Sequence, residues 1–198
     1  MVIYFAGKMV YAFIMQTLDS EEPELAYYRF YSAWLSNDTL FMTGNEKEKG
    51  CLYDSSIEKK NLLYFIIKKV HMLYSLKLKQ SLIPIQNKDM KTIIRGSHKE
   101  SNWKSQEFNV VWEGVPGIGF SLIFEKDGNM LHAQNVLDLI VSELEKHIQL
   151  VSYPSIAVKT LDTIALIVDK FLPGGQLLFL NSTLVKNLER QLEADLKS

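Results

Sequence analysis

The sequence predicts an α+β fold in which helices pack on a five-stranded antiparallel sheet. Two strand-like segments rich in apolar and aromatic residues open the chain, and three more lie in its middle. Helically spaced apolar residues follow each group, which gives the order strand, strand, helix, three strands and three helices. With 198 residues, of which 47% are hydrophobic, the chain can bury a substantial core, and we expect residues 1–198 to form one domain.

The first two strands are expected to form a hairpin. Residues 9–18 form an almost continuous apolar run, which is typical of a strand buried on both faces. An acidic turn with Pro23 follows, and the aromatic residues at 27–33 favour a second strand. The apolar start at residues 1–15 is interpreted as part of this strand and not as a signal peptide, because its only basic residue is the central Lys8.

The first helix is expected to begin near Ser55, since Ser55 and Glu58 have the spacing of a capping box. Its inward face is predicted from helical spacing and should run for about six turns, to Leu78. The residues of that face are Leu63, Ile66, Ile67, Val70, Leu73 and Tyr74. Residues 79–105 have few apolar residues and many helix and strand breakers, and are predicted to be a flexible insertion.

Three strands are expected at 109–115, 119–125 and 130–134, as a meander. The pair Asp127-Gly128 favours a two-residue hairpin turn between the second and the third of them. Asn135 should then cap a helix whose inward residues are Leu137, Ile140, Val141, Leu144 and Ile148.

Two closing helices are expected on either side of a turn that begins at Pro173. Pro173 cannot continue the apolar helix that precedes it, and Gly174 and Gly175 can adopt the positive φ that ends a helix. Asn181 can cap the last helix, which should pack through its leucines and Val185. No side chain in this turn can act as an acid, a base or a nucleophile, which favours an interaction protein over an enzyme.

The composition argues against several classes of protein. The formal net charge of −1 gives no overall field for nucleic acid or membrane. The single cysteine, Cys51, cannot form an internal disulfide and suits a reducing compartment such as the cytosol. The longest apolar runs are too short to span a bilayer.

The motifs that suggest chemistry have simpler interpretations. Residues 114–119 resemble a phosphate loop, but strands are expected on both sides of it, so a hairpin turn is favoured. The four histidines are too dispersed, with one cysteine, for a zinc site. No nucleophile-elbow pattern indicates a hydrolase. We therefore expect no catalytic residues, no metal site and no cofactor.

A basic stretch runs from residue 58 to residue 99, with ten Lys or Arg residues and two acidic ones. It predicts a partner or lipid-binding patch, a solvated helix face being the simpler alternative. The patch residues are Lys59, Lys60, Lys68, Lys69, Lys77 and Lys79.

Two segments resemble a known family. Residues 9–18 resemble the opening strand of the sigma subunits of clathrin-adaptor complexes, and residues 168–175 resemble a sigma segment that reads Val-Asp-Glu-Met-Phe-Leu-Ala-Gly. Within these small chains the sequence is identified as similar to the sigma subunits of the fifth adaptor protein complex. The shared residues of the closing turn are Phe171, Leu172, Pro173, Gly175, Gln176, Leu177, Leu178, Phe179, Leu180 and Asn181. A second shared run is Val110, Val111, Trp112, Gly114, Val115, Gly119 and Phe120.

The resemblance implies a longin-like fold and a non-enzymatic role. Such a chain is a light subunit of a heterotetrameric coat adaptor, beside large beta and zeta subunits and a medium mu subunit. The complex associates with spatacsin and spastizin, and moves protein cargo from late endosomes and lysosomes towards the Golgi. The chain itself would be cytosolic and peripheral on those membranes through its partners, with a nuclear pool left open. It would take no small-molecule substrate and no nucleic acid.

A light chain should also expose an apolar patch, for which the second strand and residues 177–180 are the candidate. The alternative to a sigma-type adaptor subunit is a longin-domain trafficking regulator, such as a subunit of a GTPase-exchange complex.

Overall fold

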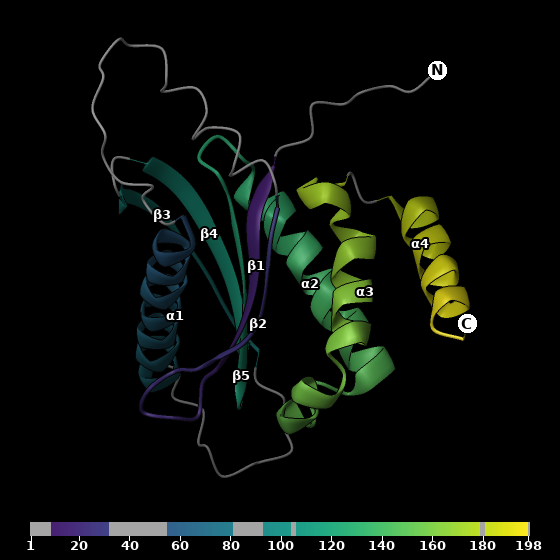
Figure 1. Ribbon diagram of the computed structural model, residues 1–198, viewed down its shortest axis with the longest axis horizontal. Helices are drawn as coiled ribbons and strands as arrows, with labels where there is room; N and C mark the ends of the chain where they lie inside the picture. The colour runs from purple at the N-terminus through teal and green to yellow at the C-terminus, as the bar shows by residue number, and fades with distance from the viewer. Residues whose placement is uncertain (1–8, 32–54, 81–92, 104–105, 179–180, 198) are drawn as a thin grey trace.

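A five-stranded antiparallel sheet divides the molecule into two helical layers (Figure 1). The computed structural model describes residues 9–31, 55–80, 93–103, 106–178 and 181–197. The strands are β1 (Val10–Thr17), β2 (Leu25–Phe30), β3 (Ile94–Trp103), β4 (Gln106–Val115) and β5 (Ile118–Glu125), in the spatial order β2-β1-β5-β4-β3. The predicted α+β class is confirmed, and the arrangement fits a longin-like fold.

The helices are α1 (Ser55–Gln80) on one face of the sheet and α2 (Met130–Ile148) and α3 (Leu161–Phe171) on the other. The last helix, α4 (Ser182–Asp195), lies outside α3 in Figure 1. Short 3-10 helices span Pro154–Lys159 and Pro173–Gly175. No helix in the described part of the chain combines the length and the apolar character needed to cross a membrane.

Strand β1 lies between β2 and β5 in the sheet and contributes side chains to both cores. Phe13 and Met15 pack with α2 and α3, whereas Ala12 and Ile14 pack with α1. All four are fully buried. The apolar run at 9–18 therefore encodes a strand that is covered on both faces, as predicted. Its hairpin with β2 is also confirmed, with Phe13 opposite Arg29.

Helix α1 attaches to the sheet by one face, as its sequence pattern predicts. Leu63, Ile66, Ile67, Val70 and Tyr74 of the predicted set are buried, and Leu73 is half-buried. The helix ends at Gln80, two residues beyond the predicted end.

The expected strand at 130–134 is wrong, because these residues form the first turns of α2. Asn129, not Asn135, is the N-cap, and its side chain accepts a hydrogen bond from the backbone nitrogen of His132 at 3.1 Å. Helical spacing already begins at the buried Ala133 and continues through Leu137. The Asp127-Gly128 turn therefore joins a strand to a helix and not two strands.

The third strand of the meander is β3, which lies within residues predicted to be a flexible insertion. The prediction is wrong for residues 94–103, and residues 81–92 lie outside the described part of the chain. This edge strand alternates buried Ile94 and Glu100, which face α1, with exposed residues such as Arg95 and Lys99. Its low apolar content is that of a strand with one solvated face.

Candidate interaction surfaces

The closing turn holds the end of α3 against the edge of the core. Phe171 and Leu172 are fully buried, and the backbone nitrogen of Leu172 still donates to the carbonyl of Val168. Gly174 and Gly175 then adopt positive φ values of 60° and 82°. A Cβ atom on Gly175 would lie 2.6 Å from Cγ of Tyr31. The glycine at 175 is thus required by conformation and by space.

The rest of the turn leads from the sheet to α4. Gln176 forms an isolated antiparallel bridge with Met9, beside β1, and Leu177 is buried. Asn181 caps α4, since its side chain accepts a hydrogen bond from the nitrogen of Leu184 at 2.7 Å. Leu178 is half-buried, Pro173 is exposed, and Phe179 and Leu180 lie outside the described residues. The described motif residues thus have mainly architectural roles.

The predicted apolar patch is only partly assembled. On β2, Leu25 and Tyr28 are 38% and 48% exposed, whereas Leu177 belongs to the core. The edge strand β2 therefore contributes to an exposed apolar area without the closing turn.

Two of the predicted basic residues make contacts with the sheet. Lys69 forms an ion pair with Glu100 of β3, and the side chain of Glu100 is only 6% exposed. Burial, together with the Lys69 ammonium, lowers the pKa of the neighbouring His98 to about 4, against the opposing effect of Glu100. Lys77 donates to the backbone carbonyl of Arg95, with its Nζ 5.4 Å from the ring centroid of Trp112. These two lysines fasten α1 to the sheet.

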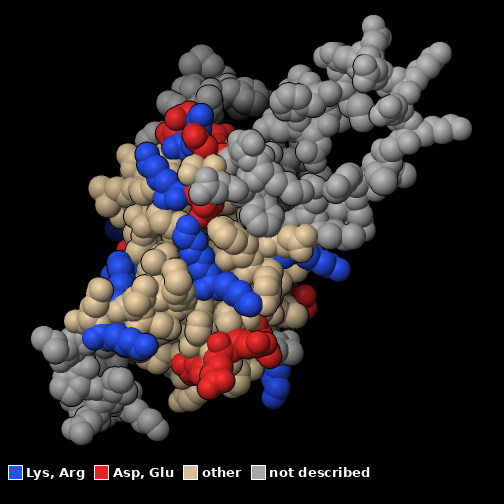
Figure 2. All heavy atoms as spheres, turned by 90° about the vertical axis from the view of Figure 1, so that its left-hand side faces the viewer, with Lys and Arg blue, Asp and Glu red and all other residues tan. Residues whose placement is uncertain are grey.

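The other predicted basic residues lie elsewhere on α1. Lys60, Lys68 and Lys79 are exposed, and Lys59 is half-buried. The Nζ of Lys68 lies 4.3 Å from the ring centroid of Tyr64, and that of Lys59 lies 5.8 Å from the ring centroid of Phe30. Figure 2 shows lysines scattered among uncharged surface on the face that carries α1, with acidic side chains gathered above and below them. The basic residues thus include a pair that joins α1 to β3 and β4, and others, such as Lys60 and Lys68, that are exposed.

The glycine-rich segment at 114–119 is the turn between β4 and β5, as predicted. Gly114 pairs with Gly119 in the ladder, and Gly117 has a φ of 93°. Strands lie on both sides of this segment, so it lacks the following helix whose amides would hold a phosphate.

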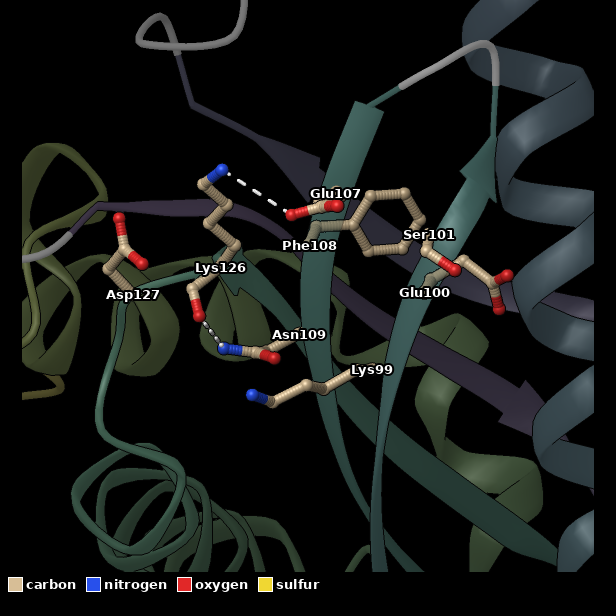
Figure 3. A pocket seen from close by; sticks show the side chains of 8 residues that line it. All are labelled: Lys99, Glu100, Ser101, Glu107, Phe108, Asn109, Lys126 and Asp127. Atoms are coloured by element: carbon tan, nitrogen blue, oxygen red, sulfur yellow. Dashed lines mark hydrogen bonds and ion pairs between the residues drawn. The ribbon is translucent and has the colours of Figure 1, made fainter.

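A pocket of about 360 Å³ opens where the β3–β4 hairpin meets the turn after β5 (Figure 3). Two of the residues that line it form an ion pair, with Lys126 Nζ 3.4 Å from Glu107 Oε2. The buried Asn109 donates its two amide hydrogens to the carbonyls of Glu125 and Lys126, at 3.0 and 2.8 Å. Most of its lining is charged, with both signs present, unlike the largely apolar sites of small ligands. The lining residues are Lys99, Glu100, Ser101, Glu107, Phe108, Asn109, Lys126 and Asp127.

One buried carboxyl was not singled out by the sequence. Glu113 of β4 is 1% exposed and faces α2, near Arg95 and Asp138. Burial raises the pKa of Glu113 to about 8, the Asp138 carboxyl adds to this rise, and the Arg95 guanidinium opposes it. The available signal was its position in β4, since Glu113 alternates with the core residues Val111 and Val115.

Among the described residues, no group of three or more His, Cys, Asp and Glu side chains is placed to hold a metal ion. Cys51 lies outside those residues.

Comparison with known proteins supports the predicted resemblance. A sequence model of the family described as AP-5 complex subunit sigma-1 matches residues 9–193. A human protein named AP-5 complex subunit sigma-1 is 39% identical over 85 residues. That alignment covers 43% of this chain and 42% of the human protein, less than half of either. Because the family match spans nearly the whole described fold, the chain belongs to the AP-5 complex subunit sigma-1 family.

Proposed function

We propose that this chain is a small, sigma-type structural subunit of a heterotetrameric vesicle-coat adaptor complex in endosomal protein transport. The observation that carries the proposal is the family match over residues 9–193, which spans the whole sheet and nearly all of the helical layers. The transport step is retrieval of cargo from late endosomes and lysosomes towards the Golgi.

The chain acts by binding and catalyses no reaction of its own. Its sheet is covered by helices on both faces and offers a rigid body to a larger subunit. A permanent interface of this kind buries more than about 2,000 Å² in total. Residues 1–198 act as one domain, with no cofactor and no small-molecule substrate.

The partners are the large beta and zeta subunits and the medium mu subunit, with spatacsin and spastizin joining through the complex. The chain works in the cytosol and reaches late endosomes and lysosomes through these partners. The family match does not favour the alternative of a GTPase-exchange subunit.

Affinity purification of the tagged full chain, followed by mass spectrometry, tests this proposal. We expect zeta, beta and mu subunits in near-equimolar amounts, with the tag alone as the control. Pairwise co-expression with zeta or with beta then identifies the large subunit that is contacted. Recovery of the chain without any adaptor subunit, or with a small GTPase whose nucleotide release it accelerates, contradicts the proposal.

A further inference from the structure

The outer surface of α1 carries a row of five side chains spaced four residues apart: Lys60, Tyr64, Lys68, Met72 and Leu76. We call this row the α1 ridge. Tyr64, Met72 and Leu76 are 55%, 52% and 48% exposed. They stand opposite the face through which α1 packs on the sheet, so the fold does not account for their apolar character.

The charge along most of helix α1 itself has one sign, and the acidic Glu22 of the β1–β2 turn lies near Lys68. From residue 59 to residue 80 the helix contains six lysines and no aspartate or glutamate. Lys69 and Lys77 contact the sheet, although Lys77 is itself exposed, and Lys60 and Lys68 lie exposed on the ridge. Of the nine large hydrophobic residues that are exposed in the described part of the chain, three lie on this ridge. The surface therefore suits a partner that offers both apolar and acidic side chains to this row.

The spacing of the ridge is compatible with a helix as that partner. Side chains at every fourth position form a ridge that fits the groove of a second helix, at about −50° and at about 8–10 Å between axes. A helix that binds a membrane instead places a wide apolar face in the lipid. The apolar face of α1, which includes Leu62, Ile66 and Val70, is already buried against the sheet.

We propose that the α1 ridge is the docking surface for an acidic helix of another subunit of the adaptor complex. Tyr64, Met72 and Leu76 enter the groove of that helix, and Lys60 and Lys68 pair with carboxylates on its flanks. The inference rests on the proposed function, because it takes the partner to be a companion subunit.

The first test compares two variants of the full chain, co-expressed with the other adaptor subunits. Met72→Glu with Leu76→Glu places acidic groups in the docking surface. Leu131→Glu is the matched control, since Leu131 is 71% exposed on α2, beyond the opposite face of the sheet. We expect the double variant to weaken association by about tenfold or more, as loss of central apolar contacts does, and the control to leave it unchanged. Circular dichroism of each purified variant reports whether the fold is kept.

The second test keeps the inference decidable if the double variant fails to fold. A photo-crosslinking residue at Met72 should capture a peptide from a helix rich in Asp and Glu, and the same residue at Leu131 should not. Lys60→Glu with Lys68→Glu should weaken association by about fivefold or more at 0.1 M salt and by less at 0.5 M salt.

Three outcomes overturn the inference while the proposed function stands: a complex that forms equally well with the double variant, crosslinks from Met72 only to this chain itself, and crosslinks to a basic segment. Flotation of the free chain with vesicles containing 30% phosphatidylserine, abolished by the ridge variants alone, would also overturn it in favour of a lipid surface. If the wild-type chain assembles with no adaptor subunit, the proposed function fails and the inference fails with it.

Discussion

Substitutions at Gly175 and at its neighbour Gly174 separate the free-energy cost of a left-handed backbone from the cost of a steric clash. Both have positive φ, at 82° and 60°. A Cβ atom on Gly175 would lie 2.6 Å from Cγ of Tyr31 and 2.8 Å from the carbonyl oxygen of Val10. A Cβ atom on Gly174 would meet no heavy atom within 4 Å.

The expected losses in the free energy of unfolding follow from these surroundings. An L-residue in the left-handed region costs about 1–2 kcal/mol, which applies to both positions. Gly175→Ala also forces a methyl group into a filled site, at about 1–3 kcal/mol, and neither the backbone oxygen of Val10 nor Cγ of Tyr31 can move aside cheaply. We therefore expect Gly174→Ala to lower the free energy of unfolding by about 1–2 kcal/mol and Gly175→Ala by about 2–5 kcal/mol.

Urea titration monitored by tryptophan fluorescence measures this difference, since Trp112 is 1% exposed in the core. A thermal melt provides a second measure, at about 2–4 °C for each kcal/mol in a chain of this size. Equal losses at the two positions would refute the steric argument. A larger loss for Gly174→Ala would contradict the described conformation of the turn.

Three further predictions concern buried charge and helix capping. The folded pKa of Glu113, about 8, lies above its ordinary value of 4.5, so the folded state holds the extra proton. The free energy of unfolding should therefore fall by about 3–5 kcal/mol as the pH rises from about 4.5 to 8, and Glu113→Gln should remove this slope in urea titrations at several pH values. Lys69→Met leaves the Glu100 carboxylate buried without its cation and should cost about 2–3 kcal/mol. Adding Glu100→Gln should recover most of that loss, and additive losses in the double-mutant cycle would contradict the pairing. Asn181→Ala removes the cap of α4 and should cost about 1 kcal/mol, seen as faster amide exchange confined to that helix, whereas exchange spread over the sheet would argue against a local role.

Local patterns predicted the elements whose role is set by neighbours in the sequence. The run at 9–18 is apolar at successive positions, which is typical of a strand covered on both faces, and β1 has that place. The closing turn was equally clear, because Pro173 and the two glycines act through their own backbone restrictions.

The predictions that the structure contradicts concern segments whose conformation depends on contacts distant in the sequence. Strand β3 has a polar sequence because it lies at the edge of the sheet and shows one face to solvent. Residues 130–134 can form either a strand or a helix, and the packing of α2 on β4 and β5 decides between them. The division of the lysines of α1 into a pair that contacts the sheet and a set that faces solvent required the position of Glu100, thirty-one residues beyond Lys69.

The sequence by itself determined the α+β class, the first strand with its two covered faces, the amphipathic first helix, the closing turn and the family resemblance. Each of these is written in periodicity, in backbone restriction or in shared residues, which are properties of contiguous segments. Only the tertiary structure decided which strand completes the sheet, that a carboxyl at Glu113 is buried beside Asp138, and that Tyr64, Met72 and Leu76 remain uncovered. Burial and exposure depend on which remote segments meet, and spacing along one chain does not contain that information.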